Sequence, residues 1–127
     1  MKPIRYMLLG FLAIIIFSGC SKSSKEFIEE LKPQHSNYKL HLFYTDGSTP
    51  YNEMNEVQVF INSSPVFKDN ITEMNGHDYS ERLNKKLKKL GITTYPMYVL
   101  MNKDGVVYKS PYLSEMKSLI KQELKLN

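Results

Sequence analysis

The feature of this sequence that most constrains its fold is the alternation of two apolar repeats along residues 25–126. Apolar residues recur at every second position where a strand is expected, and at every third or fourth position where a helix is expected. We predict strands at residues 38–45, 70–74, 97–101 and 106–109, and helices at residues 25–32, 50–61, 79–90 and 114–126. This order predicts an α/β fold in which helices flank one mixed sheet of four strands.

Residues 50–61 fit both repeats. Val57, Val59 and Ile61 alternate as in a strand, whereas Met54, Val57, Phe60 and Ile61 repeat as in a helix. We favour the helix, because Thr49 is a preferred residue for its N-cap and Pro50 suits its first position.

Local signals predict where other elements begin and end. Asp78 followed by Glu81 has the spacing of an N-terminal capping box, and Gly91 is typical of a helix end. Asn75 and Gly76 predict a turn after the second strand. We expect the helix at residues 79–90 to bury one face, formed by Tyr79, Leu83, Leu87 and Leu90.

The size and charge of the chain exclude several classes of protein. A chain of 127 residues is enough for one domain. Lys2 and Arg5 lie in a segment that we expect to be removed from the mature chain. Without them, the 17 basic residues fall to 15 against 13 acidic ones, which gives a net charge of about +2. This charge does not favour a nucleic-acid partner, which needs a concentrated basic face. With one cysteine and three unclustered histidines, we expect neither a disulfide within the chain nor a metal site.

The first residues have the pattern of a secretory signal peptide. Lys2 and Arg5 precede an apolar run of about 11 residues at positions 7–17, shorter than the roughly 20 needed to span a membrane. Ser18, Gly19 and Cys20 follow. The stretch at residues 17–20 resembles the bacterial lipobox, although that family favours Leu where Phe17 stands.

The lipobox resemblance implies that the chain is cut before Cys20. In that family a diacylglycerol, with fatty acids such as palmitate, is attached to the cysteine sulfur. The lipid would replace the discarded apolar segment as the membrane anchor, and two or more acyl chains anchor stably. Residues 21–25 are polar and rich in serine, which predicts a short flexible tether.

The mature chain resembles the thioredoxins. The run Gly91-Ile92-Thr93-Thr94-Tyr95-Pro96-Met97-Tyr98-Val99-Leu100, followed by Asp104-Gly105, matches a thioredoxin helix end, residue-proline step, apolar strand and turn. The resemblance covers roughly residues 38–126. It implies that the Tyr95–Pro96 bond is cis and that its loop faces the functional site.

The thioredoxin signature Cys-x-x-Cys is missing. The corresponding region, residues 45–52, contains no cysteine, and the resemblance places Ser48 and Thr49 near the position of the nucleophile. Disulfide exchange needs a free thiolate, and a lipid would occupy the sulfur of Cys20. We therefore expect no oxidoreductase activity.

Several side chains remain open to two interpretations. Thr49 is either a helix cap alone or, with Ser48, a hydroxyl contact for a ligand; we favour the cap. Tyr95, Pro96 and Met97 form either a structural turn or an edge that binds an extended peptide. The basic residues of the predicted helix at 79–90 are either a solvated face, which we favour, or a contact for anionic headgroups or cell-wall polymers: Arg82, Lys85, Lys86, Lys88 and Lys89. For His41, a structural role in its strand is favoured over a catalytic one.

The sequence therefore predicts a signal peptide at residues 1–19, a lipidated Cys20 with a tether to residue 25, and a thioredoxin-like domain at residues 26–127. We expect an extracytoplasmic protein, anchored to the cell membrane through its lipid. It would act as a redox-inactive binding or adaptor module for a peptide, a protein or cell-wall material, without a cofactor. The alternative is a non-cysteine enzyme of the same superfamily that uses Ser48 or Thr49.

Overall fold

The computed structural model describes residues 25–45 and 50–125. The chain divides into two compact units, residues 1–30 and residues 31–127. In the first unit, residues 25–30 are helical, in agreement with the helix predicted there. The predicted signal peptide and Cys20 lie outside the described residues. Within the described ranges, no helix is long and apolar enough to cross a membrane.

The second unit is one mixed sheet with helices on both faces. The elements follow in the order β1 (Tyr38–Tyr44), α2 (Pro50–Asn62), α3 (Pro65–Asn70), β2 (Glu73–Asp78), α4 (Glu81–Lys89), β3 (Met97–Asn102), β4 (Gly105–Ser110) and α5 (Leu113–Glu123). The sheet order is β2-β1-β3-β4, so that β2 and β4 are its edges. β1 is parallel to β2 and antiparallel to β3, and β3 is antiparallel to β4. This confirms the predicted four-stranded mixed sheet.

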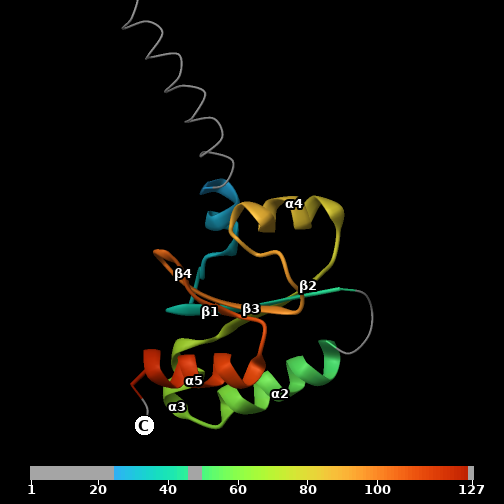
Figure 1. Ribbon diagram of the computed structural model, residues 1–127. Coiled ribbons are helices and arrows are strands. Elements are labelled where there is room, and N and C mark those ends of the chain that lie inside the picture. The colour runs from blue at the N-terminus through green and yellow to red at the C-terminus, as the bar shows by residue number, and fades with distance from the viewer. Residues whose placement is uncertain (1–24, 46–49, 126–127) are drawn as a thin grey trace, which may run out of the picture. The chain divides into compact units, whose positions relative to one another are not determined.

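Three helices cover one face of the sheet and α4 covers the other (Figure 1). The larger core lies under the three helices and combines residues of the central strands with one apolar side of each helix. Its buried members are Leu40, Leu42, Val57, Ile61, Phe67, Ile71, Tyr98, Leu100, Met116 and Ile120. Most of this core comes from elements that the two apolar repeats predicted, and Phe67 comes from α3, which they did not predict.

Residues 50–62 are a helix, which confirms the favoured prediction. Val57 and Ile61 are buried one turn apart, whereas Val59 is 65% exposed. A strand would have placed all three on one face. The helical spacing decided the outcome because it puts two of these side chains in the core and the third in solvent.

The prediction for residues 63–78 was wrong in two places. Residues 65–70 form a short helix that was not predicted, and it begins because Pro65 follows Ser64 in an extended conformation. The strand predicted at residues 70–74 lies at Glu73–Asp78 instead. Asn75 and Gly76 are within this strand and do not form a turn. A Cβ on Gly76 would lie 3.3 Å from the ring of Tyr44, so a larger residue would require that ring to shift by a few tenths of an ångström.

The helix cap predicted at Asp78 was also wrong. Asp78 is the last residue of β2, and its carboxylate accepts a hydrogen bond from the backbone N–H of Tyr79. Ser80 is the N-cap of α4, since its hydroxyl accepts a hydrogen bond of 3.1 Å from the N–H of Leu83. The strand pairing holds Asp78 in the sheet, so the next residue with a capping oxygen takes its role.

Gly91 ends α4, as predicted, with a φ of +78°. The N–H of Gly91 bonds to the carbonyl of Lys88, and the N–H of Ile92 bonds to that of Leu87. This is the hydrogen-bond pattern of a Schellman motif.

We expect Gly91→Ala to lower the free energy of unfolding by about 1 kcal/mol, because a left-handed φ is unfavourable for a residue with a Cβ. The new Cβ would lie 2.9 Å from Nζ of Lys109, the end of a flexible side chain that can move away. Chemical denaturation measures the change. Gly91→Asn is the control and should cost less, since Asn tolerates this region. Equal stability of the Ala variant and the native chain would contradict the argument.

Candidate functional site

Four chain segments meet at one end of the sheet. The register pairs Tyr44 with Asp78, Phe43 with Met97, and Tyr98 with Ser110. The carboxyl ends of β1, β2 and β4 therefore lie beside the start of β3. Ligands of open α/β sheets commonly bind outside the carboxyl ends of the parallel strands. We call this region the proline end, formed by residues 44–45, 78–79, 95–97 and 110–112.

The proline end contains the loop that the sequence analysis singled out. The Tyr95–Pro96 bond is cis, as the resemblance implied. Pro96 is exposed and Tyr95 is half-buried, whereas Met97 is only 7% exposed and belongs to the core. Of the three predicted binding residues, Pro96 and the outer part of Tyr95 are therefore available to a partner.

Two further tyrosines extend this surface. Tyr79 is 42% exposed, and its ring meets that of Tyr95 edge to face, with ring centroids 5.6 Å apart. The prediction that Tyr79 lies on the buried face of α4 was wrong, because it precedes the helix. Tyr112, which follows β4, is 64% exposed. Aromatic rings that are partly exposed to solvent are typical of binding surfaces.

Hydrogen bonds fix the side chains behind this surface. The hydroxyl of Tyr95 donates to Oδ1 of Asn84 on α4 at 2.8 Å. The hydroxyl of the buried Tyr98 donates to Oε2 of Glu53 on α2 at 2.7 Å. Burial, followed by the hydrogen bond to Glu53, raises the pKa of Tyr98, so this hydroxyl stays a donor. The proline end is thus held from both faces of the sheet.

Three of the predicted site residues are not placed. Ser48 and Thr49 lie between β1 and α2, outside the described residues. Cys20 is also outside them. Their predicted roles stay predictions.

A histidine pair lies on the face of the sheet that α4 covers. His41 is 0% exposed, and its Nε2 lies 2.7 Å from the carbonyl oxygen of Leu31. A carbonyl only accepts, so Nε2 of His41 carries the proton, and Nδ1 accepts from Nε2 of His77 at 2.8 Å. Phe43 stacks on His77 with centroids 4.6 Å apart. This confirms the prediction of a structural role for His41.

Burial lowers the pKa of His41 to about 4, because the cation is poorly solvated there. Burial, with the nearby charge of Lys39, also lowers the pKa of His77. The pairing was not predicted from the sequence, since the two histidines are brought together only by the parallel register of β1 and β2. Within residues 25–45 and 50–125, no group of three or more His, Cys, Asp or Glu side chains is arranged to hold a metal ion.

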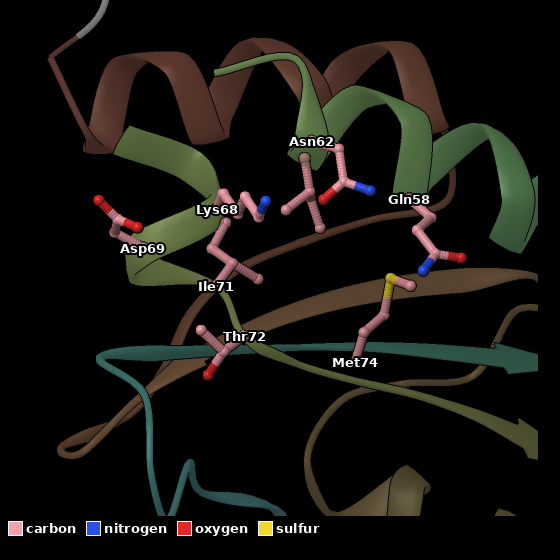
Figure 2. A pocket seen from close by; sticks show the side chains of 8 residues that line it. Gln58, Asn62, Lys68, Asp69, Ile71, Thr72 and Met74 are labelled. Carbon is pink, nitrogen blue, oxygen red and sulfur yellow. The ribbon is translucent and has the colours of Figure 1, made fainter. Parts of the chain in front are cut away.

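A separate pocket of about 480 Å³ lies between α2, α3 and the start of β2 (Figure 2). Its floor is apolar, with the buried Ile61 and Ile71 beside Met74. Polar side chains line its rim: Gln58, Asn62, Lys68, Asp69 and Thr72. The described site residues that the sequence predicted do not line it, and its residues come from three elements that no single motif connects.

The comparisons with known proteins bear on the fold. No protein-family model matches the sequence, and no curated protein matches it. A crystal structure of thioredoxin f2 from Chlamydomonas reinhardtii is similar, with a TM-score of 0.55 and 18% identity over 79% of this chain and 91% of that chain. Malassezia sympodialis thioredoxin has a TM-score of 0.51 and 12% identity over 76% of this chain and 82% of that chain.

A third solved structure agrees with these two. Mitochondrial thioredoxin 3 from Saccharomyces cerevisiae, in its oxidized form, has a TM-score of 0.50 and 14% identity over 80% of this chain and 87% of that chain. Identities in this range establish the fold alone. The chain has a thioredoxin-like α/β fold, as the sequence analysis predicted.

Proposed function

We propose that this chain is a lipid-anchored binding module of the cell envelope, which holds an extended peptide segment of a partner at the proline end. The observation that carries the proposal is an exposed cis-proline between two exposed aromatic side chains. Pro96 lies beside the edge-to-face pair of Tyr79 and Tyr95, and Tyr112 follows the neighbouring strand β4.

The chemistry of this surface favours an extended peptide. An exposed proline and aromatic rings offer flat apolar area that needs little ordering on binding. Both sides of β3 are paired within the sheet, so an extended peptide would pair with the backbone of the loop that precedes Pro96, in the manner of an added strand. The rigid support from Asn84 keeps the Tyr95 ring in place without a partner.

Redox chemistry is not part of the proposed function. The sequence has one cysteine, and the lipobox resemblance assigns its sulfur to the lipid. Disulfide exchange needs a free thiolate, so a domain without one would bind a peptide without exchanging disulfides. The proposal is therefore a module that retains and positions its partner.

The binding test is site-specific photocrosslinking in cells that produce the full chain. A photoreactive aromatic residue at position 79 should capture a discrete partner, because Tyr79 is part of the proline end and its ring contacts that of Tyr95. The control carries the same residue at Val106, which is 42% exposed and pairs with Met101 near the opposite end of β3. Tyr112→Ala or Pro96→Ala should reduce capture from position 79. The same products from both positions would contradict the proposal.

The anchoring test is incorporation of labelled palmitate. We expect the native chain to take up label and to sediment with membranes, and Cys20→Ser to lose both properties. Ser21→Ala is the matched control, since it alters the neighbouring residue and leaves the sulfur. Labelling that persists in Cys20→Ser would refute the lipid anchor while leaving the peptide-binding test untouched.

A further inference from the structure

The basic residues of α4 have an arrangement that its packing does not explain. The nine residues Glu81–Lys89 include five basic side chains and one acid. Arg82, Lys85, Lys88 and Lys89 are exposed, and their side chains form no ion pair or hydrogen bond within the described part of the chain. On the opposite face of the sheet, Lys117 does pair with an acid, Glu56, at 2.9 Å.

The four exposed cations form one continuous stripe. Positions 82, 85 and 89 are spaced by three and four residues, and position 88 lies beside them on the same side of the helix. Like charges at this spacing repel one another in the isolated protein. A partner with many negative charges would relieve this repulsion along the whole helix, whereas a single carboxylate would not.

The path of the chain relates this stripe to the proposed anchor. The carbonyl of Leu31 is bonded to His41, whose side chain points to the face of the sheet that α4 covers. The domain therefore begins on the α4 face. Ten residues lie between Cys20 and Leu31, and the eleven residue steps that join them span no more than roughly 40 Å. A lipid on Cys20 would keep this face near the membrane.

We propose that the stripe of Arg82, Lys85, Lys88 and Lys89 binds the anionic headgroups of the membrane and holds the domain with α4 toward the lipid. The proposal rests on the lipid anchor of the proposed function. Each basic residue close to an anionic surface strengthens binding by about fivefold, so four of them strengthen it by several hundredfold. In this orientation the opposite face, with α2, α3 and α5, points away from the membrane (Figure 1).

The test uses the full lipidated protein in vesicles of phosphatidylcholine alone or mixed equally with phosphatidylglycerol. One form carries a dye at Glu81→Cys, on α4, and a second form carries it at Val59→Cys, on α2 and the opposite face. Spin labels on the lipid headgroups quench the dye when it lies close to the membrane surface. We expect strong quenching at position 81 only on the anionic vesicles, with loss of the difference at high salt. Position 59 should be quenched weakly on both.

Two variants of equal net charge distinguish binding through the stripe from attraction by the net positive charge of the whole protein. The first replaces Arg82, Lys85, Lys88 and Lys89 with Gln and should abolish the difference between the vesicles. The second, with the same net charge, has Gln at Lys68, Lys103, Lys121 and Lys125 and should keep most of it. Equal effects of the two variants, or equal quenching on both vesicles, would overturn the proposal.

A third arm separates this proposal from the anchor. Residues 31–127 form a compact unit, so the chain from residue 20 onward can be made without its lipid. We expect this protein to sediment with anionic vesicles and the first variant not to do so. That result would support headgroup binding by the stripe even if the native chain carries no lipid. The absence of sedimentation at low salt would count against it.

Discussion

Lowering the pH from 7 to 4 should reduce the free energy of unfolding by about 3 kcal/mol through His41 alone. The folded protein holds the pKa of His41 at about 4, against 6.5 for a free imidazole. Between these values the unfolded chain binds more protons, so acid favours unfolding, and each unit of difference corresponds to about 1.4 kcal/mol. The stabilisation is complete above pH 6.5 and is lost as the pH falls to 4.

Denaturant unfolding at a series of pH values measures this dependence. His41→Leu should be less stable at pH 7, because the carbonyl of Leu31 and the ring of His77 lose their partner, but its stability should depend much less on pH. His35→Gln is the histidine control, since the His35 side chain is exposed. An unaltered slope in His41→Leu would show that another group is responsible.

Glu73 acts in a lower pH window, and its effect overlaps that of His41 only between about pH 4.5 and pH 4. Burial opposes ionisation of this carboxylate, but hydrogen bonds from the backbone of His35, Ser36 and Gln34 outweigh it and lower its pKa to about 2. Stability from Glu73 is therefore present above about pH 4.5 and is lost toward pH 2.

Leu87→Ala should lower the free energy of unfolding by about 2 to 5 kcal/mol, the range for a leucine removed from a close-packed core. Leu87 is the one residue of α4 that is fully buried, with 0% of its side chain exposed. The rest of the helix is polar or half-buried, so no second anchor compensates for the loss.

The effect should be concentrated on α4. Hydrogen exchange should show the amides of Glu81–Lys89 opening far more often in Leu87→Ala, with a smaller change in the central strands. Lys85→Ala is a matched control on the exposed side of the same helix and should be close to neutral. Uniform exchange across the sheet and helix would contradict a local role for Leu87.

The order of the elements was predictable because most of them contain a regular run or repeat of buried apolar residues. Met97 to Met101 are all buried in a central strand, and Met116 and Ile120 face the core one turn apart. α3 was not predictable from its pattern, since six residues with a single buried side chain, Phe67, give no repeat. Gly76 was misread because its signal depends on the ring of Tyr44, more than thirty positions earlier in the chain.

Only the part of the candidate site that lies in one continuous stretch of sequence was predictable. Pro96 and its cis bond followed from the resemblance of residues 91–105, but the same run gave no sign that Met97 is buried. Tyr112 joins the site through the pairing of β3 with β4, and His41 meets His77 through the pairing of β1 with β2. Contacts of this kind depend on strand register, which no short motif contains.

The edge strand β2 affects whether copies of this protein that are crowded together on one surface associate with one another. No described strand pairs with the outer side of β2, and such an edge is a template for pairing with a second copy. β2 has only six residues, with Glu73 and Asp78 at its two ends and Gly76 inside it. Like charges and a short, weakly strand-forming stretch make edge-to-edge pairing unfavourable. Copies crowded on one surface would therefore not associate through β2.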